Sequence, residues 1–247
     1  PVVVLAIVRN FGIQYVPWLA LFGVALGLML FLFAPQQTSP KTRSRAKLFD
    51  RELFLGPVGL LSVAGMLRAA AFISFTNAIP LYLVNVRGFD TDSAVIGWTL
   101  ACYSGAAAVA VLISGALEAR VGRARLAGGS MIIALPLLLS VLLLTPDTLL
   151  FYVTAALAGA FTNAAIPLLI VTAQELAPHA VATASGMLMG FTWGVAGVLY
   201  IGFGALQQLL GLGPALALGF SFLIPGALLT LYVMRRYRHR LGAAGPA

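Results

Sequence analysis

Arg68 is the residue with the clearest capacity for chemistry, because it interrupts a long apolar run from Leu53 to Val86. A helix of that length exceeds the ~20 residues that cross a lipid bilayer. A charge near its middle costs roughly 2.5–3.5 kcal/mol on insertion, so Arg68 is expected to face protein or water. Its planar fork of donors suits a carboxylate, phosphate or phosphonate. The alternative is that Arg68 snorkels, or binds backbone carbonyls where two helices meet.

Three further polar side chains are candidates for the same site. Thr76 lies about 80° from Arg68 around an ideal helix, whereas Asn77 lies about 180° away. Asn77 can share a cavity with Arg68 only if the helix distorts, which Pro80 would allow. Asn163, in a second apolar run, could be a ligand or a packing hydrogen bond. The candidate substrate-binding residues are Arg68, Thr76, Asn77 and Asn163.

The segment around Asn77 recurs around Asn163. Residues 75–81 read FTNAIPL, and residues 161–168 read FTNAAIPL with one residue inserted. The two apolar runs would begin on opposite sides of a membrane, and inverted repeats of three helices are a transporter architecture. Coincidence is the alternative, since Ala, Leu and Phe dominate both segments. In either case the two prolines are expected to kink their helices.

The composition is that of a chain that lies in a lipid bilayer. Of the 247 residues, 61% are hydrophobic and 9% are charged, whereas soluble domains carry about 25% charged residues. Lys and Arg flank apolar runs, so no nucleic-acid partner is expected. One Cys and two His provide no metal-ligand cluster, and we expect no metal and no cofactor. The sequence therefore predicts an all-α, polytopic transmembrane bundle with the lipid bilayer as its partner.

Apolar runs and polar connectors divide the chain into four parts. These are two preceding helices, one of them partial (1–34), a cytoplasmic linker (35–52), a six-helix unit (53–234) and a basic cytoplasmic tail (235–247). The spans expected in the six-helix unit are residues 53–86, 94–117, 126–144, 149–173, 184–210 and 215–234. Because the chain begins inside an apolar run without an initiator Met, we expect a fragment of a longer protein.

Basic residues indicate which ends of the spans face the cytoplasm. Lys and Arg gather in alternate connectors, within residues 41–51, 120–125 and 235–240, while the opposite side holds only Arg9 and Arg87. The positive-inside rule places the richer connectors, and with them the C-terminus, in the cytoplasm. Gln174 and Glu175 then lie at a cytoplasmic helix end. There Glu175 could pair with a basic loop residue as part of a gate, or could simply be solvated.

Small residues recur at multiples of four in two of the expected spans. They include Gly97, Gly105, Gly186, Gly190 and Gly194. Rows of this kind let another helix approach closely in lipid. We predict that these glycines form helix-packing interfaces, along which helices could rock.

The loop at residues 115–123, GALEARVGR, resembles the cytoplasmic motif between the second and third helices of each half of a major facilitator transporter. That motif has Gly, an acidic residue, Arg, a spacer, Gly and a basic residue. Here Ala119 stands where the family's Asp usually lies, and Glu118 is adjacent. The resemblance adds five candidate gate residues to Gln174 and Glu175. These are Gly115, Glu118, Arg120, Gly122 and Arg123.

The segment at residues 173–178, AQELAP, and the glycines that follow residue 184 look like the fosmidomycin-resistance branch of that superfamily. A basic residue early in the seventh helix, here Arg68, is also similar to that branch. The resemblance implies a twelve-helix, two-half transporter of a bacterial inner membrane, working by alternating access. This chain would supply part of helix five and helices six to twelve. The family implies export of a small drug-like or anionic molecule in exchange for protons, with the proton-carrying acid in the missing N-terminal half.

Two other classes of protein stay open. A membrane enzyme would need paired acids, a metal-ligand set or a nucleophile–base pair at one depth, but no acidic residue lies mid-span. A non-transporting sensor or partner descended from a transporter is the second alternative. A substrate-dependent flux would distinguish both from a transporter.

Overall fold

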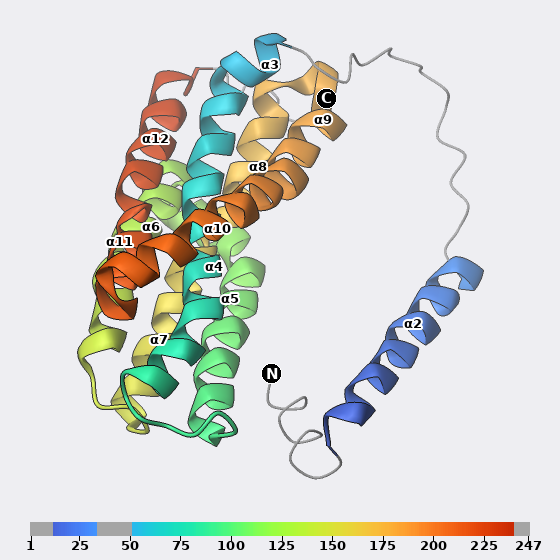
Figure 1. The fold of residues 1–247 in the computed structure, drawn as a ribbon. Coiled ribbons are helices and arrows are strands. Elements are labelled where there is room, and N and C mark those ends of the chain that lie inside the picture. The colour runs from blue at the N-terminus through green and yellow to red at the C-terminus, as the bar shows by residue number, and fades with distance from the viewer. Residues whose placement is uncertain (1–11, 34–50, 240–247) are drawn as a thin grey trace.

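The computed structural model describes residues 12–33 and 51–239, in which every regular element is helical (Figure 1). The 3-10 helix η1 (Ile13–Trp18) leads into α2 (Leu19–Phe33), which covers the second apolar run of the sequence. The first apolar run, Arg9, most of the predicted linker and the tail beyond residue 239 lie outside the described residues.

Six helices in the described part of the chain are long and apolar enough to cross a membrane. Three are single helices: α4 (Pro57–Asn85), α5 (Ala94–Val121) and α6 (Arg123–Leu143). Three are built from consecutive segments: α7 (Leu149–Asn163) with α8 (Ala165–Leu176); η2 (Pro178–Ala180), α9 (Val181–Gly186), the π-helical η3 (Met187–Phe191) and α10 (Thr192–Leu210); and α11 (Leu212–Ser221) with α12 (Leu223–Arg236). The predicted all-α membrane bundle is confirmed.

The apolar run from Leu53 to Val86 is divided near its start. The short helix α3 (Arg51–Leu55) ends before Gly56, and Pro57 begins α4. Proline favours this first helical position because its missing N–H has no partner there anyway. The chain between α3 and α4 turns so tightly that a Cβ on Gly59 would lie 1.8 Å from the Phe54 carbonyl oxygen. The span predicted from Leu53 therefore begins at Pro57.

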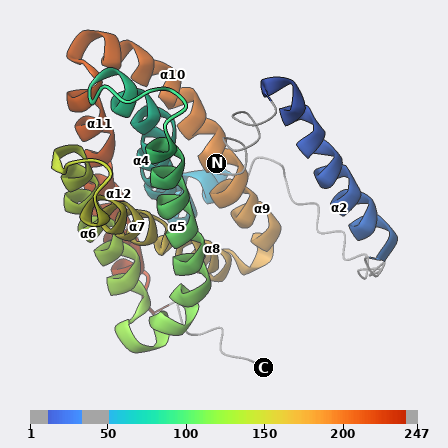
Figure 2. The same cartoon turned by 90° about the horizontal axis from the view of Figure 1, so that it is seen from below.

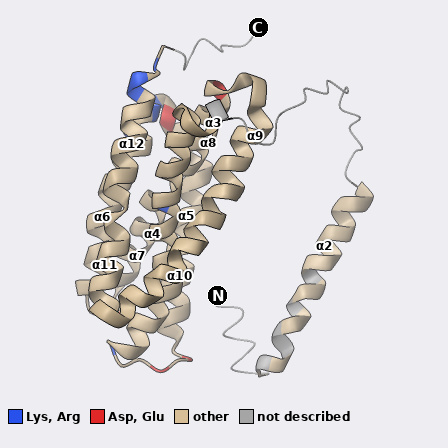
Figure 3. Ribbon diagram, turned by 45° about the horizontal axis from the view of Figure 1, so that its top comes forward, with Lys and Arg blue, Asp and Glu red and all other residues tan. Residues whose placement is uncertain are grey.

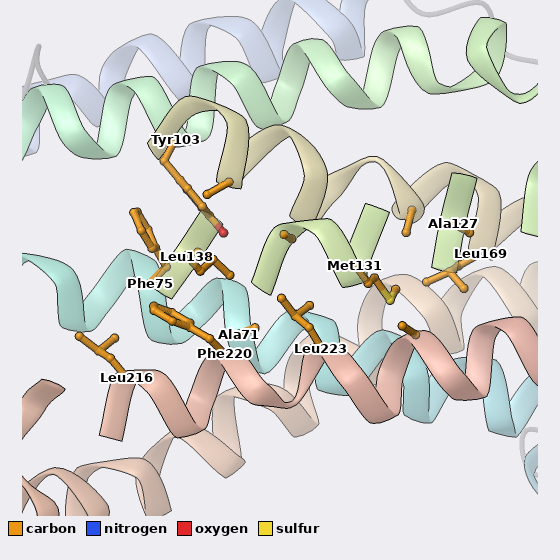
Figure 4. Packing of buried hydrophobic residues seen from close by; sticks show 14 of the residues in the cluster. Ala71, Phe75, Tyr103, Ala127, Met131, Leu138, Leu169, Leu216, Phe220 and Leu223 are labelled. Atoms are coloured by element: carbon orange, nitrogen blue, oxygen red, sulfur yellow. The ribbon is translucent and has the colours of Figure 1, made fainter. Parts of the chain in front are cut away.

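Helix α4 is the most buried of the six spans and contacts α8, α10, α11 and α12 (Figures 1 and 2). Its Phe75 ring stacks on Tyr103 of α5, with ring centroids 3.9 Å apart, and lies 6.2 Å from Phe220 of α11 (Figure 4). Helices α5 and α9–α10 are the least buried spans. Apolar side chains thus pack around α4, while two spans keep broad exposed faces.

Close approach between α5 and α7 depends on Gly159, which the sequence analysis did not single out. A Cβ at Gly159 would lie 2.0 Å from the Tyr103 carbonyl oxygen. A second close contact joins α6 to α12, where a Cβ at Gly128 would lie 2.4 Å from Leu231. Glycine is required at both positions because any side chain would push the helices apart.

The glycine rows predicted from spacing are not the close contacts of this bundle. Gly97 is buried, but Gly105 on α5 is exposed. Gly186, Gly190 and Gly194 are also exposed, and a Cβ at any of these four would meet nothing within 4 Å among the described residues. Four-residue spacing places residues on one face of a helix but does not say whether that face points inward. Four of these five glycines therefore make no close contact within the described bundle, and a packing role for the rows stays a prediction.

The span predicted at residues 149–173 is interrupted at Ala164, between α7 and α8. Pro167 explains the break, because its nitrogen has no hydrogen to donate to the Asn163 carbonyl and its ring crowds that carbonyl. The matching Pro80 lies inside α4, which continues to Asn85. Charged residues gather at the two ends of the bundle (Figure 3). Arg68 lies inside α4, away from both of its ends.

We expect Gly159→Ala to destabilise the protein. The new Cβ would overlap the Tyr103 carbonyl oxygen, so α7 must move away from α5, and overpacking of this kind costs about 1–3 kcal/mol. Thermal unfolding of the purified full-length protein in detergent measures the effect. Gly129→Ala is the matched control, because a Cβ at Gly129 meets no atom within 4 Å among the described residues. Equal melting temperatures for the two variants would contradict the close contact.

Candidate functional site

Arg68 lies in the first half of α4 and is only 2% exposed, although it carries a charge. Its Nη1 donates a hydrogen bond to Oδ1 of Asn163, at the end of α7, over 3.1 Å. Asn163 is itself 3% exposed. The structure therefore brings together two of the four predicted binding residues, which are 95 positions apart in the chain.

The Asn163 side chain is held in the orientation that Arg68 needs. Its Nδ2 donates to the Gly159 carbonyl oxygen, one turn earlier in α7, over 2.9 Å. With the amide nitrogen engaged, the amide oxygen faces the guanidinium. Gly159 thus has two functions, because it also permits the close approach of α5. The break at Ala164 follows directly after Asn163 and ends α7 at this contact.

Aromatic rings complete the surroundings of Arg68. The guanidinium carbon lies 5.5 Å from the centre of the Trp193 ring on α10, within the range of a cation–π interaction. Trp193 packs edge-on against Phe72, with centroids 5.4 Å apart. The Tyr103 ring lies 5.6 Å from the Phe72 ring and so belongs to the same aromatic cluster. The sequence analysis missed Trp193 and Tyr103, since aromatic residues in an apolar span give no sign of their direction.

A small cavity of about 20 Å³ adjoins Arg68 and is lined also by Gly65, Thr192 and Trp193. A polar cavity of this size holds about one water molecule. The Nε of Arg68 is buried and has no hydrogen-bond partner among the described residues. Within the same residues, Arg68 also has no carboxylate partner. The buried cation therefore retains both a free donor and an uncompensated charge.

Thr76 and Asn77 do not lie with Arg68. The Thr76 hydroxyl donates to the carbonyl oxygens of Phe72 and Ile73, one turn earlier in α4. Asn77 is exposed, and its Nδ2 donates to the Ile73 carbonyl oxygen over 3.0 Å. Both side chains bond within their own helix, because Pro80 does not rotate them toward Arg68. A binding role for either residue stays a prediction.

A second polar cluster lies where α5 and α8 end and α6 begins. Arg123, the first residue of α6, donates from Nε to Glu118 and from Nη1 to Glu175, each over 2.5 Å. All three side chains are about a quarter exposed: 23% for Arg123, 26% for Glu118 and 23% for Glu175. We call this three-residue contact the Arg123 bridge. It joins the ends of three helices.

The other candidate gate residues surround the bridge. Gln174 donates from Nε2 to the Ser185 hydroxyl over 2.8 Å and so links α8 to α9. Gly122 has a φ of +87°, a conformation that glycine adopts without strain and that turns the chain from α5 into α6. Gly115 and Arg120 are exposed on α5. Ser185 was not among the predicted gate residues.

The opposite end of the bundle carries a different contact. The Arg87 guanidinium donates to the carbonyl oxygens of Leu142 and Leu144 at the end of α6, and the Tyr82 hydroxyl donates to Leu142 over 2.9 Å. A cation at a helix C-terminus is favourable because the last carbonyls carry partial negative charge. Arg87 therefore ties α4 to α6, a function that its place in a loop did not indicate.

The six apolar helices of membrane length define an integral membrane protein. The family model of the Major Facilitator Superfamily matches residues 1–201, which include Arg68, Asn163 and the Arg123 bridge. The chain belongs to the Major Facilitator Superfamily, whose members are transporters and not enzymes. No curated protein and no solved structure matches the chain.

We expect the Arg68–Asn163 contact to appear as a coupling free energy in a double-mutant cycle. Arg68→Met and Asn163→Leu each leave a buried polar group without a partner, which costs about 1–3 kcal/mol. The double variant removes both groups. Its loss of stability should therefore be smaller, by about 1–3 kcal/mol, than the sum of the losses in the two single variants. Melting of the four purified full-length proteins measures this difference. Arg68→Met with Asn77→Leu is the control pair and should be additive, and additivity in both cycles would contradict the contact.

Proposed function

We propose that this protein is a secondary active transporter that exports a small drug-like or anionic molecule in exchange for protons. The observation that carries the proposal is the buried Arg68, whose charge no carboxylate neutralises among the described residues. Such a guanidinium can bind a carboxylate, phosphate or phosphonate in two parallel hydrogen bonds. The family supports transport, and the cation supports an anionic group on the cargo.

The surroundings of Arg68 favour a cargo with an anionic group beside an apolar or aromatic part. Trp193 offers a ring face next to the guanidinium. The present cavity of about 20 Å³ is too small for such a molecule, so the site must open for binding. We propose that the exposed faces of α5 and α9–α10 form the open side, and that a second half of the transporter covers them. Binding would then compete with Asn163 for the guanidinium.

Alternating access requires contacts that form at one end of the bundle and break in the next state. The Arg123 bridge is suited to this, because its three charged side chains are partly exposed and join three helix ends. We propose that it closes the cytoplasmic side. Coupling to protons would use an acidic residue outside the described spans, since these have no Asp or Glu near their centres.

The transport proposal predicts that Arg68→Ala abolishes export. Accumulation of fosmidomycin, a phosphonate, would be followed in a drug-sensitive bacterium expressing the full-length protein, with and without a protonophore. Wild type should lower accumulation, the protonophore should restore it, and Arg68→Ala should behave like the empty vector at equal membrane expression. Arg236→Ala, an exposed arginine at the end of α12, is the matched control and should export like wild type. Unchanged accumulation in well-expressed wild type would reject this substrate, and protonophore-insensitive export would reject proton coupling.

The gate proposal predicts that Arg123→Gln opens the cytoplasmic end. Ala177 is 1% exposed beside the end of α8, so a cysteine there, in a cysteine-free background, reports opening by its rate of thiol labelling. Loss of about 1 kcal/mol of closed-state stability should raise that rate about fivefold. Arg236→Gln removes an exposed charge at the end of α12 that forms no ion pair within the described chain, and it should change labelling little. Equal labelling of the two variants would argue against the bridge as a gate.

A further inference from the structure

A cavity of about 680 Å³ lies at the end of the bundle that carries the Arg123 bridge. It lies where the α5–α6 turn, the end of α8 and the end of α12 meet, and blue and red residues gather at this end in Figure 3. We call it the basic cavity. Its charged lining residues are Glu118, Arg123, Arg125, Glu175, Arg235 and Arg238. Four arginines against two glutamates leave an excess of positive charge.

The excess charge lies on three of the arginines. Arg123 is bound by both glutamates in the Arg123 bridge. In contrast, the side chains of Arg125, Arg235 and Arg238 are exposed and form no ion pair with any described residue. Arg125 comes from the start of α6, Arg235 from the last turn of α12, and Arg238 from the turn that follows α12. Three unpaired guanidinium groups around one cavity are suited to bind a phosphate group, which accepts several hydrogen bonds from such donors.

An apolar groove continues from the basic cavity along α12. It has a volume of about 580 Å³ and is lined by Leu228, Leu231, Tyr232, Arg235 and Arg236. Leu228 and Tyr232 are more than half exposed, at 59% and 57%. Arg235 borders both the groove and the basic cavity. An anionic site and an apolar groove therefore meet at one residue.

We propose that the basic cavity and this groove together bind an anionic phospholipid. The phosphate would lie between Arg125, Arg235 and Arg238, and one acyl chain would follow the groove past Leu228 and Tyr232. Basic pockets between membrane helices bind anionic headgroups, and the positive-inside rule predicts that this end faces the cytoplasmic leaflet. A soluble phosphate ester would use the cavity but leave the groove empty, so the groove favours a lipid. The inference is independent of the proposed cargo and direction of transport.

The test measures lipid retention by the purified full-length protein in detergent, by native mass spectrometry. The two probes are dioleoyl phosphatidylglycerol and dioleoyl phosphatidylcholine, which share their acyl chains and differ in net charge. Wild type should retain phosphatidylglycerol in preference to phosphatidylcholine. Arg235→Gln should weaken that retention about tenfold, the ratio for one lost hydrogen bond to a charged group. The double variant Arg125→Gln/Arg238→Gln should weaken retention at least as much. It changes no residue of α12 and so provides the test if Arg235→Gln fails to fold.

Arg120→Gln is the matched control, because Arg120 lies in the same turn but does not line the cavity. Its retention of phosphatidylglycerol should equal that of wild type. An equal loss in Arg120→Gln and Arg235→Gln would show attraction by general surface charge and would overturn the site. No preference for phosphatidylglycerol in wild type would also overturn it. Full displacement of the lipid by millimolar glycerol 3-phosphate would assign the cavity to soluble phosphate esters and reject a lipid site.

Discussion

The constraint on which the bundle depends is a permanent positive charge in the middle of its most buried helix. A guanidinium there is tolerated only with a hydrogen-bond acceptor and a polarisable neighbour, which Asn163 and Trp193 provide. Both come from other helices, so α4, α7 and α10 must meet at one depth. Gly159 makes this geometry accessible, since its carbonyl orients Asn163 while its missing side chain lets α5 pack against α7. One glycine thus couples helix packing to the polarity of the site.

The sequence was sufficient for the outline of the fold and for its most unusual residue. Apolar runs predict the spans because bilayer thickness sets their length, and the cost of burying a charge identifies Arg68. The partner of Arg68 could not be predicted in the same way. Angles around one helix favoured Thr76, whereas the acceptor lies 95 residues away, and the contact between two helices is decided by packing. The outward-facing glycine rows have the same explanation, because the spacing of residues defines a face but not its neighbour.

The α5–α6 turn forms an ion pair although its acidic residue is displaced by one position from that of the motif it resembles. The family's usual Asp position is Ala119, yet Glu118 provides a carboxylate to Arg123 from the preceding residue. Glu175 supplies the second carboxylate from α8. Arg123 thus has two carboxylate partners without an acidic residue at position 119.

The π-helical turn η3 affects which changes in chain length the protein can accept. Its wide turn is closed by Thr192, whose hydroxyl donates to the Met187 carbonyl oxygen five residues earlier. Such a turn accommodates one residue more than an α-helical turn. Deleting a single residue within 187–191 would therefore remove the extra residue and restore an α-helical turn, while the residues after it keep roughly their present face. Trp193 would then stay beside Arg68. Lineages related by gain or loss of that residue would differ in length at this turn and still share the site.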